Sequence, residues 1–203
     1  MTAVIINRMT ASARDRMILS AAVLMRQQGV EATSFSDVIE HSGAPRGSIY
    51  HHFPNGKAQL IEAATRYAGE FTAAGLIAAL RTDKPADAVD AFAAQWTSML
   101  EQSNFDAGCP VVAAALEGER TPGARAAAGD AFGRWQHLVA RALEPHTTRW
   151  RARTLATLVI ASIEGAVIMA RAQRSTVPLE EVANELRRIL RGDLPPQPAS
   201  QPQ

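Results

Sequence analysis

TSFSDVIEHSGAPRGSIYHHF, residues 33–53, predicts two short helices joined by a tight turn. Ser34 can cap the first helix, and Asp37, three residues later, completes the capping pattern. Gly43 follows where a helix ends in a left-handed residue, and Pro45 suits the first turn of the next helix. A unit of this kind can present its second helix to the major groove of DNA.

The apolar residues of this stretch predict which side is buried. Ile49 and Phe53 lie four residues apart and share one helix face, which can pack on Val38 and Ile39. The polar side chains then point elsewhere and are candidates for DNA contacts. We expect base contacts from Ala44, Pro45, Arg46 and Ser48, phosphate contacts from Thr33, Tyr50, His51 and Lys57, and backbone or capping roles at the same interface from Ser34 and Gly47.

The run GAPRGSIYHHF, residues 43–53, together with Lys57, closely resembles the DNA-binding signature of the TetR (tetracycline-repressor) family. The resemblance implies an all-α protein that binds a palindromic DNA operator as a homodimer and is released by a small-molecule effector. Two further stretches, residues 108–118 and 164–179, resemble the regulatory domain of the lincomycin-resistance-repressor (LmrA/YxaF-like) subgroup. That subgroup implies a mainly apolar or aromatic effector.

Apolar residues at helical spacing continue through the rest of the chain and predict about nine helices in all. Prolines and glycines separate them, for example at Pro85, Pro110, Pro122 and Pro178. We expect an N-terminal three-helix helix-turn-helix domain at residues 11–57 and a helical ligand-binding and dimerisation domain at 58–191. The proline- and glutamine-rich tail, 192–203, is expected to be disordered, and residues 1–10 to form a loose arm.

The penultimate helix carries apolar residues around much of its surface, more than one core requires, which predicts a dimer interface. The residues expected there are Leu155, Leu158, Val159, Ser162, Ile163, Ala166, Val167 and, from the last helix, Leu186. The resemblance implies a pocket in the same domain. The residues expected to line it are Phe71, Phe92, Trp96, Met99, Phe105, Cys109, Phe132, Trp135 and Met169.

Composition limits the function classes. The 203 residues carry a net charge of +1, so local placement of cations must provide any phosphate binding. The single cysteine, Cys109, rules out an intrachain disulfide, and we expect a cytoplasmic protein. The apolar run 155–170 contains Glu164 and is shorter than the roughly twenty residues a bilayer requires, so a buried helix is expected.

Nothing in the sequence indicates an enzyme. The five histidines form no HExxH pair, Cys109 has no second ligand at zinc-type spacing, and no phosphate-binding or nucleophile-elbow motif occurs. We therefore expect no metal and no cofactor. Two alternatives stay open: a helical protein-interaction dimer that has lost DNA binding, and a redox-sensing regulator that acts through Cys109. The sequence also leaves activation open beside repression.

Overall fold

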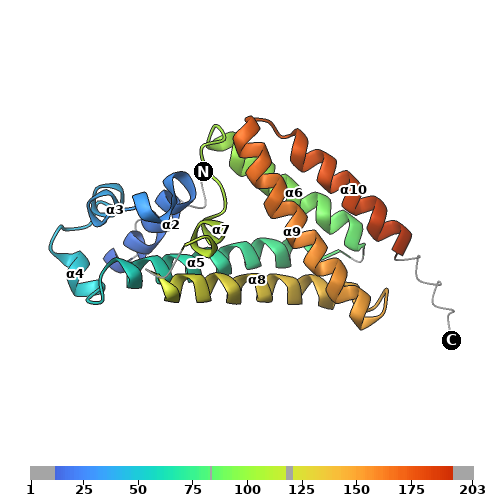
Figure 1. The fold of residues 1–203 in the computed structure, drawn as a ribbon, viewed down its shortest axis with the longest axis horizontal. Helices are drawn as coiled ribbons and strands as arrows, with labels where there is room; N and C mark the ends of the chain where they lie inside the picture. Colours follow the sequence, from blue (N-terminus) through green and yellow to red (C-terminus); the bar gives the residue numbers. More distant parts are fainter. Residues whose placement is uncertain (1–11, 83, 118–120, 194–203) are drawn as a thin grey trace. The chain divides into compact units, whose positions relative to one another are not determined.

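The computed structural model describes residues 12–82, 84–117 and 121–193, which form nine helices and no strand (Figure 1). The helices fall into two compact units. The first unit contains the chain up to Thr72 and residues 107–131, and the second contains residues 73–106 and the chain from Phe132 onward. This division differs from a single boundary after residue 57, because helices α5 and α8 each contribute residues to both units.

The first unit is organised around α2 (Ala13–Ala32), which packs against α3 (Phe35–Ser42), α4 (Ser48–His52) and α7 (Pro110–Ala115). The regular turns of α2 end at Gly29, whose φ of 85° is the left-handed value that favours glycine. The buried residues of the unit include Met17, Met25 and Ile61. α5 (Lys57–Ala79) and α8 (Pro122–Leu143) begin in this unit.

The second unit contains α6 (Pro85–Gln102), α9 (Arg149–Gln173) and α10 (Val177–Asp193). α10 packs against both α6 and α9, and α6 also contacts α9. The ends of α5 and α8 complete the unit. Its core is built from alanines and larger side chains such as Trp135, Leu155, Ile163 and Leu179, all of which are fully buried.

The predicted all-α fold is confirmed, and most helix ends lie where local signals placed them. Pro85 and Pro110 occupy first-turn positions, and the Thr148 side chain caps α9. Two ends differ. α4 begins at Ser48, because the residues after Pro45 form a turn instead, and α10 extends to Asp193, into the predicted tail. The predicted arm at 1–10 and the tail from 194 onward lie outside the described residues.

One helix in the described part of the chain, α9, is long and apolar enough to cross a membrane by length and composition. Half of its most apolar window is buried inside the structure, against α6 and α10. A helix in the core of a helical protein shows the same properties.

Candidate nucleic-acid interface

The helix-turn-helix is fixed by hydrogen bonds within its own sequence. The Asp37 amide donates to Ser34 Oγ, and the Ser34 amide donates to Asp37 Oδ2, each over 3.1 Å, so the predicted capping box is present. Hydrogen bonds from the Ser34 side chain and then its backbone hold the pKa of Asp37 below its ordinary value. At the other end of α3, Gly43 takes a φ of 64° and its amide donates to the Ile39 carbonyl.

A closed apolar core lies beneath this unit. Val38, Ile49 and Phe53 are buried, as predicted from their spacing, and the Arg14 guanidinium lies 5.5 Å from the centre of the Phe53 ring. Ala44 is also buried. The turn after α3 therefore packs on this core, which fixes the backbone from which the following side chains project.

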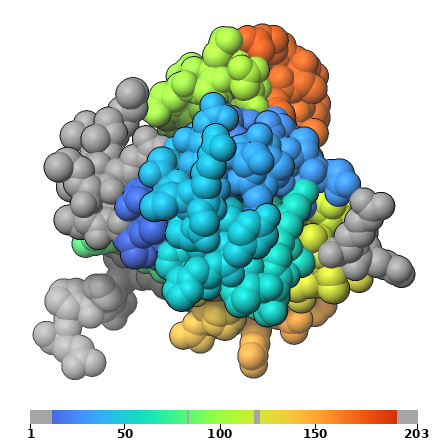
Figure 2. Space-filling view, turned by 90° about the vertical axis from the view of Figure 1, so that its left-hand side faces the viewer, coloured from blue at the N-terminus to red at the C-terminus, as the bar shows by residue number. Residues whose placement is uncertain are grey.

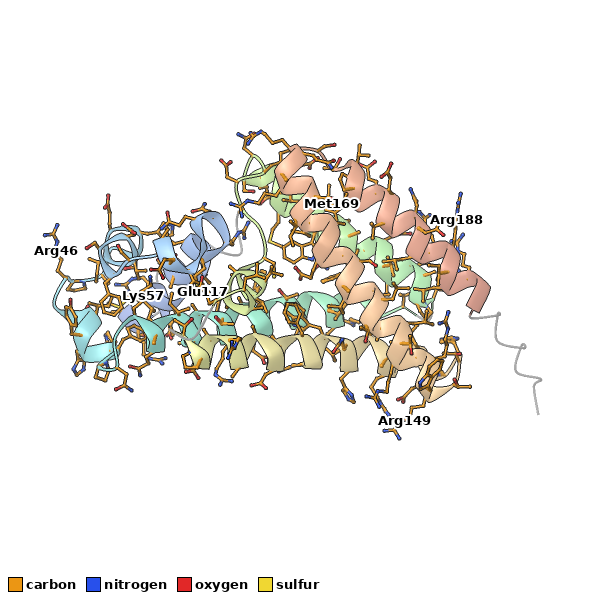
Figure 3. The ribbon with its side chains drawn as sticks, in the orientation of Figure 1. Arg46, Lys57, Glu117, Arg149, Met169 and Arg188 are labelled. Atoms are coloured by element: carbon orange, nitrogen blue, oxygen red, sulfur yellow. The ribbon has the colours of Figure 1, made fainter. Side chains whose placement is uncertain are left out.

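The side chains at the start of α4 form an exposed edge, which we call the reading edge: Pro45, Arg46, Gly47, Ser48, Tyr50 and His51. All except half-buried Ser48 are exposed, and Tyr50 is 68% exposed. Figure 2 shows the surface of α3 and α4, in light blue and cyan, facing the viewer, and Figure 3 shows Arg46 projecting from the turn between the two helices.

Tyr50 and Ser48 on this edge are positioned by neighbours. The Tyr50 ring packs edge-on against Phe35, with 5.6 Å between the ring centres, and Ser48 Oγ donates to the Pro45 carbonyl over 2.6 Å. Sequence reasoning did not single out Phe35 as a neighbour of Tyr50. Its place directly after the capping Ser34, one helix away from Tyr50, is the signal that could have indicated it.

Two predicted phosphate contacts occupy different surroundings. Lys57 is half-exposed, and its Nζ donates to the Glu31 carbonyl over 2.8 Å, which fixes the ammonium beside the turn that precedes α3. Thr33 is only 1% exposed, and its hydroxyl donates to the Gly29 carbonyl over 2.7 Å. In this structure Thr33 stabilises the backbone after the Gly29 kink, and its expected phosphate contact stays a prediction.

The residues predicted to line a pocket are divided between the two units. Phe92, Trp96 and Trp135 are buried in the second unit, with Met99, Phe105 and Phe132 half-buried. Phe71 and Cys109 belong to the first unit, where Phe71 is 56% exposed. Met169 is 50% exposed on α9. The lining of a pocket by the predicted set, including Phe71, Cys109 and Met169, stays a prediction.

Cys109 lies against α2. The amide of its neighbour Gly108 donates to the Arg26 carbonyl over 2.8 Å. Burial lowers the pKa of the Arg26 guanidinium, and the nearby Cys109 opposes that shift. The thiol itself is buried, a setting in which cysteine is normally inert toward solvent oxidants.

An apolar cavity does occur in the second unit, but it is narrow. Leu76, Val89, Phe92, Val139, Val159 and Ile163 are among the residues that line its volume of about 20 Å³. Small-molecule sites usually measure roughly 300–1,000 Å³, so this part of the core is nearly solid in the present conformation. One turn beyond Phe92, Trp96 is 3% exposed, and no acceptor among the described residues lies within hydrogen-bond reach of its indole Nε1.

Most of the predicted dimer residues are already covered within one chain. Leu155, Val159, Ile163, Ala166, Val167 and Leu186 are buried, whereas Ser162 is half-buried and Leu158 is exposed. One stripe of α9, at the helical spacing expected for a single face, is exposed or half-buried, and it includes Leu158 and Ser162 of the predicted set. We call it the α9 face; its residues are Leu158, Ala161, Ser162, Gly165, Ile168 and Met169.

Comparison with known proteins decides the class of this molecule. Residues 18–64 match the family described as bacterial regulatory proteins, tetR family, and residues 85–185 match the C-terminal domain of LmrA/YxaF-like transcriptional regulators. An uncharacterized HTH-type transcriptional regulator of Mycobacterium tuberculosis, Rv0196, is 40% identical over 90% of this chain and 96% of its own length. The chain belongs to the TetR family.

Solved structures agree with this assignment. A TetR transcriptional regulator from Chloroflexus aurantiacus is 29% identical, with a TM-score of 0.74, over 88% of this chain and 93% of its own. The TetR-family regulator CifR, solved as a cysteine mutant with a 26-base-pair operator DNA, shares the fold at 18% identity, with a TM-score of 0.69 over 86% of this chain and 94% of its own. This TetR-family protein is therefore a DNA-binding transcriptional regulator, and its relatives are regulators, not enzymes.

Within this TetR-family regulator, the described residues contain no group of three or more His, Cys, Asp or Glu side chains that could hold a metal ion. The chemistry that the helix-turn-helix offers is hydrogen bonding and charge. Arg46 offers a guanidinium fork, Tyr50 a hydroxyl and His51 an imidazole, all from one short segment.

Proposed function

We propose that this TetR-family regulator binds a palindromic operator as a homodimer, represses transcription there, and is released by a small, mainly apolar or aromatic effector in the cytoplasm. The observation that carries the proposal is the reading edge: exposed polar side chains on the turn and on α4, which directly follow α3, a helix that is capped at Ser34, ends at Gly43 and packs on α2. Because the helix-turn-helix is packed firmly on α2, its short side chains can keep their register on DNA.

Some side chains at the reading edge would contact DNA bases, and others would contact phosphates. Arg46 is exposed at the turn, where its fork can donate two hydrogen bonds to O6 and N7 of a guanine in the major groove. Tyr50, His51 and Lys57 would contact phosphates, and the bond from Lys57 to the Glu31 carbonyl would hold the ammonium in place for that contact. Ala44 and Thr33 support this surface from within.

Two copies are required because one edge is small. The α9 face places Leu158, Ile168 and Met169 in solvent, beside the small residues Ala161 and Gly165, which would let a second helix approach closely. We therefore assign dimerisation to this face, together with α10, in place of the buried residues predicted from sequence. A two-fold dimer would place its recognition helices roughly 34–36 Å apart, or a multiple, on a palindrome.

The effector would enter the core of the second unit. Because the apolar cavity is narrow, binding must select a conformation in which the surrounding helices separate, which is how occupancy could change the affinity for DNA. The buried Trp96 Nε1 suggests that the effector carries a hydrogen-bond acceptor. Tryptophan fluorescence titrated with aromatic compounds, in the wild type and in Trp96→Phe, tests this assignment.

DNA binding is tested by fluorescence anisotropy on a duplex selected from random sequence, over a series of salt concentrations. Tyr50→Ala with His51→Ala should weaken binding to every duplex and flatten the salt dependence, since phosphate contacts are not specific for sequence. Leu116→Ala, at an exposed position of the same unit, is the matched control. Unchanged affinity and slope in the double variant would refute the phosphate assignment.

A further inference from the structure

A charged groove lies in the second unit, between the C-terminal half of α8 and the N-terminal half of α9. We call it the arginine groove. The residues that define it are Gly133, His137, Arg141 and Glu144 on the α8 side and Arg149 and Arg153 on the α9 side, and its volume is about 610 Å³. Figure 3 shows Arg149 at this corner, extending into solvent.

We propose that the arginine groove binds a small polyanion, a molecule with two or more phosphate or carboxylate groups. This site is separate from the operator contacts and from the apolar core assigned to the effector. The regulator would then bind two kinds of small molecule, the apolar effector in its core and a polyanion in the arginine groove.

The charges of the groove are unbalanced. Three arginines face a single carboxylate, so cations exceed anions by two, counting three against one. Glu144 contacts Arg141 Nη1 over 3.1 Å and Arg149 Nε over 4.0 Å and can neutralise only one of them. Among the described residues, the Arg153 guanidinium has no ion-pair partner. Arg149 and Arg153 also lie four residues apart on one helix, where like charges destabilise each other.

The shape suits a small ligand. Both walls supply cations, which lets one anion be held from two directions, and guanidinium forks match phosphate and carboxylate groups. A side chain added at Gly133 would meet no atom within 4 Å, so the wall is open at that point. Gln136 Nε2 donates to Thr157 Oγ1 over 3.1 Å, which ties the two helices together beside the arginines.

The volume also favours a small molecule over a macromolecule. About 610 Å³ lies within the roughly 300–1,000 Å³ of ordinary small-molecule sites. The polar, cationic lining excludes the apolar effector assigned to the core of the same unit.

The test is isothermal titration calorimetry on the full chain at 150 mM salt, with inorganic tripolyphosphate and, in a separate arm, citrate. We expect the wild type to bind at least one of them, and the two arms distinguish phosphate from carboxylate. Arg153→Gln should lower the affinity about tenfold, which equals about 1.4 kcal/mol, and Arg149→Gln with Arg153→Gln should lower it further.

Two control variants separate the groove from general charge effects. Arg81→Gln removes an exposed arginine elsewhere in the second unit, and Arg125→Gln removes an exposed arginine of the first unit that lies outside the reading edge; both should keep wild-type affinity. Equal losses in Arg81→Gln and Arg153→Gln, or no binding by the wild type, would overturn the proposal. So would unchanged anion binding in the double variant accompanied by altered sedimentation, which would make the groove a protein contact.

Discussion

The capping box of α3 is the device that holds the reading edge, and Ser34→Ala tests it most simply. The substitution removes the hydroxyl that accepts from the Asp37 amide over 3.1 Å and leaves that amide to solvent. Replacing a capping serine by alanine typically costs about 1 kcal/mol, within a range of roughly 0.5–2. For a domain of about 200 residues, that loss lowers the melting temperature by about 2–4 °C.

Ser36→Ala is the matched control. Ser36 is exposed inside the same helix and makes no capping bond, so alanine there should be neutral or slightly stabilising. Unfolding of both variants would be followed by circular dichroism in urea at pH 7, where a shifted midpoint at constant slope reports a change in stability. Equal midpoints for Ser34→Ala and Ser36→Ala would refute the reasoning.

The pH dependence of the same pair gives a second readout. Ser34 lowers the pKa of Asp37 in the folded state, so the ionised carboxylate stabilises the fold above its ordinary pKa. That contribution is lost as the pH falls through the lowered folded pKa. The stability difference between wild type and Ser34→Ala should therefore shrink below about pH 4. A difference that grows toward low pH would contradict the sign of this linkage.

Three further substitutions test other parts of the structure. Gly43→Ala should destabilise the protein by roughly 1–2 kcal/mol, because the φ of Gly43 is 64°, a left-handed value, although no atom lies within 4 Å of the added Cβ. Its control, Gly129→Ala, lies at an open helical position and should be neutral or stabilising in the same urea titration. Gly69→Ala should cost about 1–3 kcal/mol, since its Cβ would lie 2.8 Å from Ala131 Cβ, and a melting temperature equal to that of the wild type would exclude this close approach. Ile168→Glu should convert a dimer to a monomer in light scattering, because Ile168 is 53% exposed on the α9 face, whereas Leu116→Glu in the first unit should leave the mass unchanged.

Local signals predicted the helices well because each acts within a few residues. Ser34 with Asp37, Gly43 and the first-turn prolines determine where helices begin and end, whatever packs on them later. The same locality explains why Ile49 and Phe53 were placed correctly. Their four-residue spacing places them on one helix face, and in a three-helix unit an apolar face packs against the single core.

Positions that depend on distant contacts could not be predicted in the same way. α9 is apolar around most of its surface, so periodicity does not say which face meets α6 and α10 and which stays exposed; Ile163 and Ile168 look alike in sequence. Thr33 is polar and follows a helix, yet the Gly29 kink brings its hydroxyl within hydrogen-bond distance of the Gly29 carbonyl, and the Thr33 side chain is buried. Cys109 lies in the first unit because its loop returns to α2, a pairing no local pattern records.

Operator specificity should depend most on the exposed Arg46, which projects from the turn after α3 and is proposed to contact a base. Selection of bound sequences from random DNA, carried out for the wild type and for Arg46→Ala, tests it most directly, with Arg125→Ala as an exposed arginine control in the same unit. We predict a palindrome in which Arg46→Ala loses preference for guanine at one symmetric pair of positions, while Arg125→Ala selects the wild-type sequence. Identical selected sequences for wild type and Arg46→Ala would contradict the claim.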